Sequence, residues 1–188
     1  MNRQTISPIV AGILPSDANI EFVGITDTKE VLWFQHGNNH YFKDLPEEIY
    51  QKLEEKYLSD APAVKHLSGE YPKLRRQVEV YTFYLYGDLD TIPDYANGKL
   101  GESENIFFGT ECPSLDFDNK HITVNGVELN KRDLIIIEMI KDEATDKQIA
   151  ARLGIAIPTL DYHKRNLFKK VGVMTKAGLI NRINMERI

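Results

Sequence analysis

The stretch TDKQIAARLGIAIPTLDYHKRNLFKKVGV, residues 145–173, contains two helical patterns separated by a glycine. Thr145 is followed three residues later by Gln148, which is the spacing of a capping box and predicts the start of a short helix. Gly154 suits the end of that helix because glycine adopts the left-handed conformation without steric cost. After a tight turn, a second helix is expected over about residues 158–171. This order of elements predicts a helix-turn-helix motif.

The second helix of this motif has two chemically different faces. Residues at three- and four-residue spacing are expected to face inward: Leu160, His163, Leu167 and Val171. The residues left on the other side are Asp161, Tyr162, Arg165, Asn166 and Lys169. Four basic residues could neutralise DNA phosphates while the outward side chains contact base edges. These are Lys164, Arg165, Lys169 and Lys170. A structural helical bundle with a solvated basic face remains the alternative interpretation.

Charge is distributed unevenly along the chain, whose formal net charge is −5. From Leu129 onward there are 12 Lys and Arg against 7 Asp and Glu, whereas the preceding 128 residues hold 11 against 21. The net charges of the two parts are therefore +5 and −10. This asymmetry indicates a nucleic-acid-facing domain joined to one that does not contact nucleic acid. A basic surface without any partner is the alternative.

The segments on either side of the motif complete an all-α domain over residues 129–188. A helix is expected at about residues 131–141 with Asn130 as its cap, and a capped amphipathic helix is expected in the last fifteen residues. The dipeptide Asn125-Gly126 is a strong hairpin signal. Residues 106–128 are therefore interpreted as a β-containing linker.

Residues 1–105 predict an α+β domain. The segment VLWFQHGNNHYF indicates a hairpin, with Gly37, Asn38 and Asn39 between two strands. A helix is expected in KDLPEEIYQKLEEKYL, with Asp44 as its candidate cap, and a second in APAVKHL. A third is expected in KLRRQVEVYTFYLY, although its β-branched and aromatic residues favour a strand almost as strongly. We expect this domain to sense a signal, bind a partner or dimerise.

The sequence contains no recognised motif for catalysis, for a cofactor or for a metal. No nucleophile elbow, phosphate-binding loop or dinucleotide-binding glycine pattern occurs in the sequence. Three acidic residues near one another lack the glycine and distal glutamate of a calcium loop: Asp88, Asp90 and Asp94. Three histidines lack the spacing of a helical zinc site: His36, His40 and His66. Cys112 is the only cysteine, which excludes an internal disulfide. We therefore expect no metal, no cofactor and no enzymatic activity.

Hydrophobic patterning gives no indication of a membrane protein. The longest apolar runs, such as residues 134–137, are far shorter than the roughly 20 residues that a membrane span needs. The first residues, MNRQTISPIVAGILPSD, are interrupted by Pro8 and Pro15 and lack a continuous apolar region before a small-residue cleavage site. A cytoplasmic protein without a signal peptide or a membrane partner is expected.

A set of positions in the last 60 residues resembles the LuxR/NarL-type helix-turn-helix domain of bacterial transcription regulators. These positions are Leu129, Arg132-Asp133, Ile149-Ala150, Leu153-Gly154-Ile155, Thr159-Leu160, His163, Lys170-Val171 and Val173. The resemblance implies four helices, of which the third reads the DNA major groove and the fourth often forms a dimer contact. By position, it implies a base-reading set of Asp161, Tyr162 and Arg165. It implies phosphate contacts from Lys147, Thr159, Asn166, Lys169 and Lys170, to which the charge pattern adds Lys164. It places Leu179, Ile180 and Ile183 on the fourth helix, as the candidate dimer interface.

The sequence departs from this family pattern at three positions. Ile135 stands where a glutamate is usual, and Glu143 stands where a glycine is usual. Asp161 would place an acid in the groove, where it could accept a hydrogen bond from cytosine or be repelled by phosphate. The N-terminal part resembles neither a phosphoacceptor receiver domain nor an acyl-homoserine-lactone-binding domain.

We therefore expect a sequence-specific transcriptional regulator whose partner is double-stranded DNA. A homodimer on DNA and a protein or small-molecule ligand of the N-terminal domain are further expectations. A winged helix is a second binding hypothesis, and it requires a β-hairpin after the recognition helix. A protein-interaction adaptor, or a domain that docks on polymerase as region four of a sigma factor does, is the alternative from another functional class.

Overall fold

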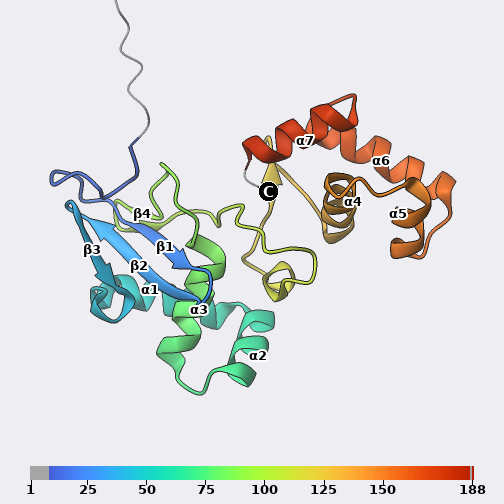
Figure 1. The fold of residues 1–188 in the computed structure, drawn as a ribbon. Helices are drawn as coiled ribbons and strands as arrows, with labels where there is room; N and C mark the ends of the chain where they lie inside the picture. The colour runs from blue at the N-terminus through green and yellow to red at the C-terminus, as the bar shows by residue number, and fades with distance from the viewer. Residues whose placement is uncertain (1–8, 187) are drawn as a thin grey trace, which may run out of the picture. The chain divides into compact units, whose positions relative to one another are not determined.

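The computed structural model describes residues 9–186 and 188. The expectation that the chain lacks a signal peptide falls largely on residues 1–8, which lie outside the described residues. The chain divides into two compact units, Met1–Glu104 with Asp116–Lys120, and Asn105–Leu115 with His121–Ile188. The segment that we expected to be a linker thus contributes residues to both units. Figure 1 shows the elements of each unit.

The N-terminal unit contains a three-stranded antiparallel sheet in the order β1 (Glu21–Ile25), β2 (Glu30–Gln35) and β3 (Asn38–Tyr41). The predicted hairpin is present, but its turn consists of His36 and Gly37, so the two asparagines lie in β3. Both turn residues have positive φ, 51° and 79°, which a two-residue turn of this twist requires.

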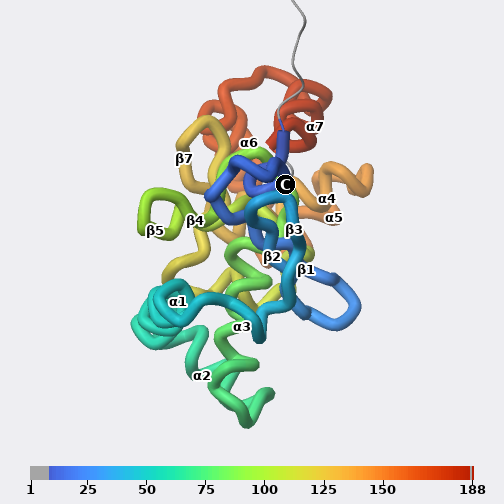
Figure 2. The backbone as a smooth tube through the Cα atoms, turned by 90° about the vertical axis from the view of Figure 1, so that its left-hand side faces the viewer, coloured from blue at the N-terminus to red at the C-terminus, as the bar shows by residue number. Residues whose placement is uncertain are grey.

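Three helices follow the sheet in the N-terminal unit: α1 (Glu47–Ser59), α2 (Ala61–Glu70) and α3 (Leu74–Tyr86). Helix α3 contacts β1 and β2 as well as the other two helices (Figures 1 and 2). Residues 80–86 of α3 are all buried, which explains why this helix tolerates the aromatic and β-branched residues of a strand. A Cβ at Gly24 of β1 would lie 2.5 Å from the Phe83 ring, so glycine permits this close approach.

The helix caps of this unit differ partly from expectation. Helix α1 begins after Pro46 without a side-chain cap, whereas Asp44, the predicted cap, ends the short helix η1 (Phe42–Asp44). Asp60 is the cap of α2, because its Oδ1 accepts a hydrogen bond from the backbone N–H of Ala63 at 3.1 Å. The same carboxylate accepts hydrogen bonds from the backbone of Asp118 and Asn119. It therefore ties the segment 116–120 to this unit.

Beyond α3, residues 87–104 form turns and a small hairpin of β4 (Tyr95–Ala96) and β5 (Lys99–Leu100). This agrees with the turn-rich composition of the segment. An isolated bridge joins Tyr95 to Ile20, just before β1. The loop is thus held against the edge of the three-stranded sheet.

The C-terminal unit consists of a short hairpin and four helices, as predicted. After η2 (Pro113–Asp116), strands β6 (Thr123–Val124) and β7 (Val127–Glu128) flank the Asn125-Gly126 turn. The helices are α4 (Lys131–Lys141), α5 (Asp146–Leu153), α6 (Ile157–Val171) and α7 (Lys176–Met185). Their inward residues form one hydrophobic core together with the hairpin. The mixed α and β N-terminal part and the four-helix C-terminal domain are both confirmed.

Among the described residues, none of the helices combines the length and apolar character that crossing a membrane would require.

Candidate nucleic-acid interface

The ends of α4, α5 and α6 are fixed by local hydrogen bonds that the sequence encodes. Asn130 and Asp133 form a reciprocal capping box at the start of α4, and Thr145 and Gln148 form another at the start of α5. Gly154 ends α5 in the left-handed conformation, with φ +65°. These caps set the short helix and the tight turn of the helix-turn-helix motif.

The inward face of α6, the second helix of the helix-turn-helix motif, packs into the core of the C-terminal unit. Leu160, Leu167 and Val171 are fully buried, as predicted. His163 is only half-buried, and its Nε2 lies 3.3 Å from a guanidinium nitrogen of Arg132 in α4. Because α6 is attached along this face, its other face is exposed to solvent.

The three predicted base-reading residues lie together on the exposed side of α6. Asp161 and Arg165 are exposed, and Tyr162 retains 56% of its accessible surface. The Arg165 Nε donates a hydrogen bond to the backbone oxygen of Asp161 at 3.3 Å. The Tyr162 ring packs edge-on against His163, with 5.5 Å between centroids. One helix face thus presents an acid, a phenol and a guanidinium side by side.

The predicted phosphate contacts fall into two groups. Four of them are exposed on α5 and α6: Lys147, Thr159, Asn166 and Lys169. Lys164 instead places its Nζ 2.8 and 2.9 Å from the two carboxylate oxygens of Asp146, and its side chain is only 14% exposed. Lys170 places its Nζ 2.7 Å from Oδ2 of Asp133. The structure therefore leaves four of the six residues exposed and pairs the other two with carboxylates, although the Lys170 side chain is still 34% exposed.

The predicted dimer residues are mostly part of the domain core. Leu179 and Ile183 are 1% and 0% exposed, because this side of α7 packs on α4 and α6. Their side chains are therefore not available to a second copy. Ile180 is half-buried, and its neighbours at the surface are Ala177, Asn181 and Asn184. The four-residue spacing of Leu179 and Ile183 was the sequence signal for an inward face.

Comparison with known proteins places this geometry in a family. The model of the family described as bacterial regulatory proteins, luxR family, matches residues 127–183. Residues 127–183 form a LuxR-family helix-turn-helix domain. The transcriptional regulatory protein MctR of Rhizobium johnstonii is 42% identical over 52 residues, an alignment that covers 28% of this chain and 24% of that protein. The chain thus matches about a quarter of this relative's length. No solved structure matches the chain.

Two departures from the LuxR-family pattern can now be located. Glu143 follows the end of α4 in the left-handed conformation, with φ 57°, so the backbone keeps the shape for which the family uses glycine. Ile135 is half-buried in α4, which suits an apolar residue. The winged-helix hypothesis is not supported, because α7 rather than a β-hairpin follows the recognition helix.

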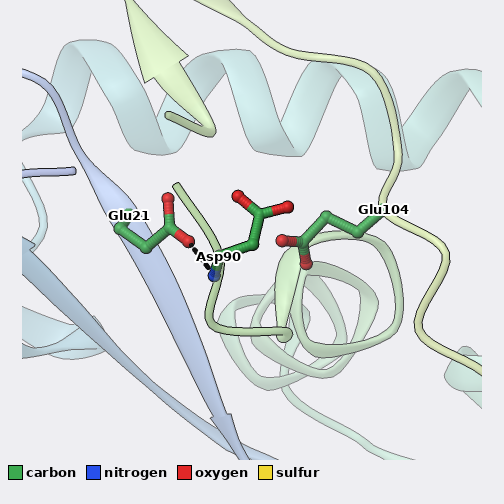
Figure 3. Close-up of side chains that lie close together, drawn as sticks. All are labelled: Glu21, Asp90 and Glu104. Atoms are coloured by element: carbon green, nitrogen blue, oxygen red, sulfur yellow. Dashed lines mark hydrogen bonds between the residues drawn. The ribbon is translucent and has the colours of Figure 1, made fainter. Parts of the chain in front are cut away.

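A second group of polar residues lies in the N-terminal unit, where one carboxylate oxygen from each of Glu21, Asp90 and Glu104 lies within 4.8 Å of the others (Figure 3). Glu21 is fully buried in β1, and its Oε1 accepts a hydrogen bond from the backbone of Asp90 at 2.8 Å. Asp94, which is 3% exposed, accepts one from the backbone of Phe22 at 2.7 Å. We refer to Glu21, Asp90, Asp94 and Glu104 as the acidic cluster.

Burial changes the titration of two residues of the acidic cluster, Glu104 and Asp94. Burial raises the pKa of Glu104 to about 9, and the negative charges of Asp90 and Glu21 act in the same direction. A hydrogen bond from the backbone N–H of Asp88 partly offsets this shift, because it stabilises the charged carboxylate and so lowers the pKa. Burial and the neighbouring Glu104 also raise the pKa of Asp94 well above its ordinary value. Protons held at neutral pH relieve the repulsion between these carboxylates. Oxygen atoms this close together also suit a hard cation such as Mg²⁺ or Ca²⁺.

The sequence pattern pointed to only half of this cluster. It brought Asp90 and Asp94 together with Asp88, but it did not point to Glu21 or Glu104. Sixty-nine residues separate Glu21 from Asp90, and no motif connects them. Only the packing of the loop against β1 brings them together. The expectation that the protein holds no metal stays a prediction.

Proposed function

We propose that this protein is a sequence-specific DNA-binding transcriptional regulator whose helix α6 enters the major groove. The observation that carries the proposal is the exposed face of α6, where Tyr162, Arg165 and Lys169 project from a LuxR-family domain. A related regulator, MctR, is named as a transcriptional regulatory protein. Because the target is DNA, we propose that the protein works in the cytoplasm.

Within this proposal the exposed residues divide into base readers and phosphate contacts. Arg165 can form two hydrogen bonds with a guanine edge, and Asp161 can accept one from cytosine N4. Tyr162 offers a hydroxyl and an apolar ring beside them. The phosphate contacts would come from the four exposed residues at the start of α5 and along α6: Lys147, Thr159, Asn166 and Lys169. These contacts set affinity and register, whereas the base readers set the sequence.

Two parts of the proposal concern partners other than DNA. A second copy bound to an adjacent half-site would contact α7 through Ile180 and its exposed neighbours, since the core retains Leu179 and Ile183. The N-terminal unit would bind a protein or small-molecule signal.

One observation favours a second candidate function. Asp161 is exposed at the centre of the proposed reading face, where its charge opposes phosphate. An acid in this place suits a basic protein surface, as in an adaptor or a polymerase-docking domain of the sigma region-four kind. This candidate uses the same fold but does not need duplex DNA.

The test is selection of bound sequences from a random duplex pool with the full chain, followed by titration at low and high salt. A regulator enriches one site, and the logarithm of its affinity falls linearly with the logarithm of salt concentration. The symmetry of the enriched site shows whether two copies read it. Absence of binding at low salt would refute DNA binding and leave the adaptor function.

A further inference from the structure

We propose that Lys164 and Lys170 are positioning residues, which hold the recognition helix through ion pairs and do not contact DNA phosphates. This inference rests on the proposed DNA binding, and it changes the roles that charge and resemblance assigned to two of the six candidate phosphate contacts. Each lysine pairs with a carboxylate on a different helix of the C-terminal unit.

The first pair connects the two helices of the helix-turn-helix. Lys164 lies near the middle of α6, and Asp146 is the first residue of α5. The lysine Nζ contacts both carboxylate oxygens, at 2.8 and 2.9 Å, and the side chains are 14% and 37% exposed. Because Lys164 lies one helical turn after the buried Leu160, it extends along the side of α6 that faces α5. The pair therefore constrains the angle between the two helices.

The second pair connects the end of α6 to the start of α4. Lys170 lies in the last turn of α6, and its Nζ is 2.7 Å from Oδ2 of Asp133, a side chain that is 8% exposed. The same oxygen accepts the backbone N–H of Asn130 at 3.2 Å, which is one half of the α4 capping box. One buried carboxylate thus caps α4 and fixes the last turn of α6.

These contacts make the two lysines poor phosphate ligands. To reach a phosphate, Lys170 would have to leave the mostly buried Asp133 without a compensating charge, which is strongly unfavourable. Lys164 would likewise have to give up both oxygens of Asp146. In addition, a lysine that a carboxylate already neutralises adds little net positive charge to the surface. It therefore releases few of the counterions that surround the DNA phosphates. Lys169 provides the contrast, because it is exposed on the same helix between the two.

The first test compares lysine variants of the full chain on the selected duplex and on a random duplex over a range of salt concentrations. Lys169→Met removes a phosphate contact, so the slope of log affinity against log salt should fall by about 0.9, and both duplexes should lose affinity alike. Lys164→Met and Lys170→Met should leave this slope unchanged. They should lower the affinity for the selected duplex at least about tenfold more than the affinity for the random duplex. A slope reduced as in Lys169→Met would overturn the inference.

The second test changes the carboxylates. If Asp146 positions α6, Asp146→Asn should lower the affinity for the selected duplex as much as Lys164→Met does. If Lys164 instead contacted phosphate, the same change would free it and strengthen binding to both duplexes. The double variant Asp146→Lys with Lys164→Asp should recover part of the specific binding that Lys164→Asp alone loses. Failure of this rescue in a double variant whose unfolding transition matches that of the unchanged protein contradicts the positioning role.

These experiments distinguish a failure of the proposed DNA binding from a failure of the positioning role. If the unchanged protein binds no duplex at low salt, the proposed function is wrong. If the unchanged protein binds but Lys164→Met and Lys170→Met behave as Lys169→Met does, only the positioning role is wrong.

Discussion

Glu104 offers a quantitative test of the acidic cluster through the variant Glu104→Gln. Glutamine keeps the shape of the side chain and can still accept the hydrogen bond from the backbone of Asp88. It removes the charge that burial and the neighbouring carboxylates disfavour. The variant therefore resembles the protonated form of the unchanged protein at every pH.

The sign and size of the effect follow from the raised pKa of Glu104. The folded protein keeps its proton up to about pH 9, whereas the unfolded chain loses it near the ordinary value of 4.5. The folded state therefore binds more protons between these limits, and the free energy of unfolding falls as the pH rises. One such group contributes up to about 1.4 kcal/mol per pH unit, hence on the order of 2 kcal/mol between pH 5.5 and 7.5. Asp94, whose pKa is also raised, acts in the same direction.

Trp33 provides the assay. It is the only tryptophan of the chain and is 4% exposed in the N-terminal unit, so its fluorescence reports the unfolding of that unit. Urea unfolding of the full chain at pH 5.5 and 7.5 should show a loss of stability with pH in the unchanged protein. Glu104→Gln should reduce this loss and be more stable at pH 7.5. Glu102→Gln, which changes an exposed carboxylate two residues away, should leave the pH dependence unaltered. Equal pH dependence in Glu104→Gln and the unchanged protein would refute the reasoning.

Three further predictions concern the C-terminal unit. Arg165→Ala should cost about 1 to 3 kcal/mol on the selected duplex and relax its specificity, whereas Lys169→Ala should weaken all duplexes alike; identical effects in binding titrations would contradict this division. Asp161→Asn should strengthen binding to random duplex by removing a charge that faces phosphate, and unchanged affinity at low salt would place Asp161 away from the backbone. Glu143→Gly should raise the stability of the C-terminal unit by about 0.5 to 1 kcal/mol in thermal unfolding, because φ is positive there, whereas Glu143→Ala should not.

The sequence predicted well those features that depend on neighbouring residues. The capping box of Thr145 and Gln148, the left-handed Gly154 and the Asn125-Gly126 turn are all present. Each arises from hydrogen bonds or backbone preferences within a few residues. Asp44 was predicted as the cap of the first helix, with Pro46 in its first turn, but α1 begins after Pro46 and Asp44 ends η1. Helix α3 was uncertain because burial between the sheet and two helices overrides local propensity.

Features that depend on distant residues could not be predicted in the same way. The acidic cluster requires β1, the loop after α3 and Glu104 to meet, and no pattern in the sequence encodes that meeting. The pair of Asp133 and Lys170 joins residues 37 positions apart. Resemblance to a family implied a role for each position but gave no contacts in this chain. It implied a phosphate contact for Lys170 and gave no sign of the ion pair with Asp133.

The spacing along α6 nevertheless contained a signal that the charge pattern obscured. Lys164 lies four residues after Leu160, and Lys170 lies three residues after Leu167, so both occupy the edge of the buried stripe rather than the opposite face. Arg165 and Lys169 are offset from that stripe and reach solvent. A lysine at the edge of a buried stripe must reach either solvent or a partner on the neighbouring helix. In this domain an aspartate at the start of α5 and another at the start of α4 supply that partner. The number of basic residues in α6 thus overstates the charge that the helix presents to solvent, since part of that charge is neutralised within the domain.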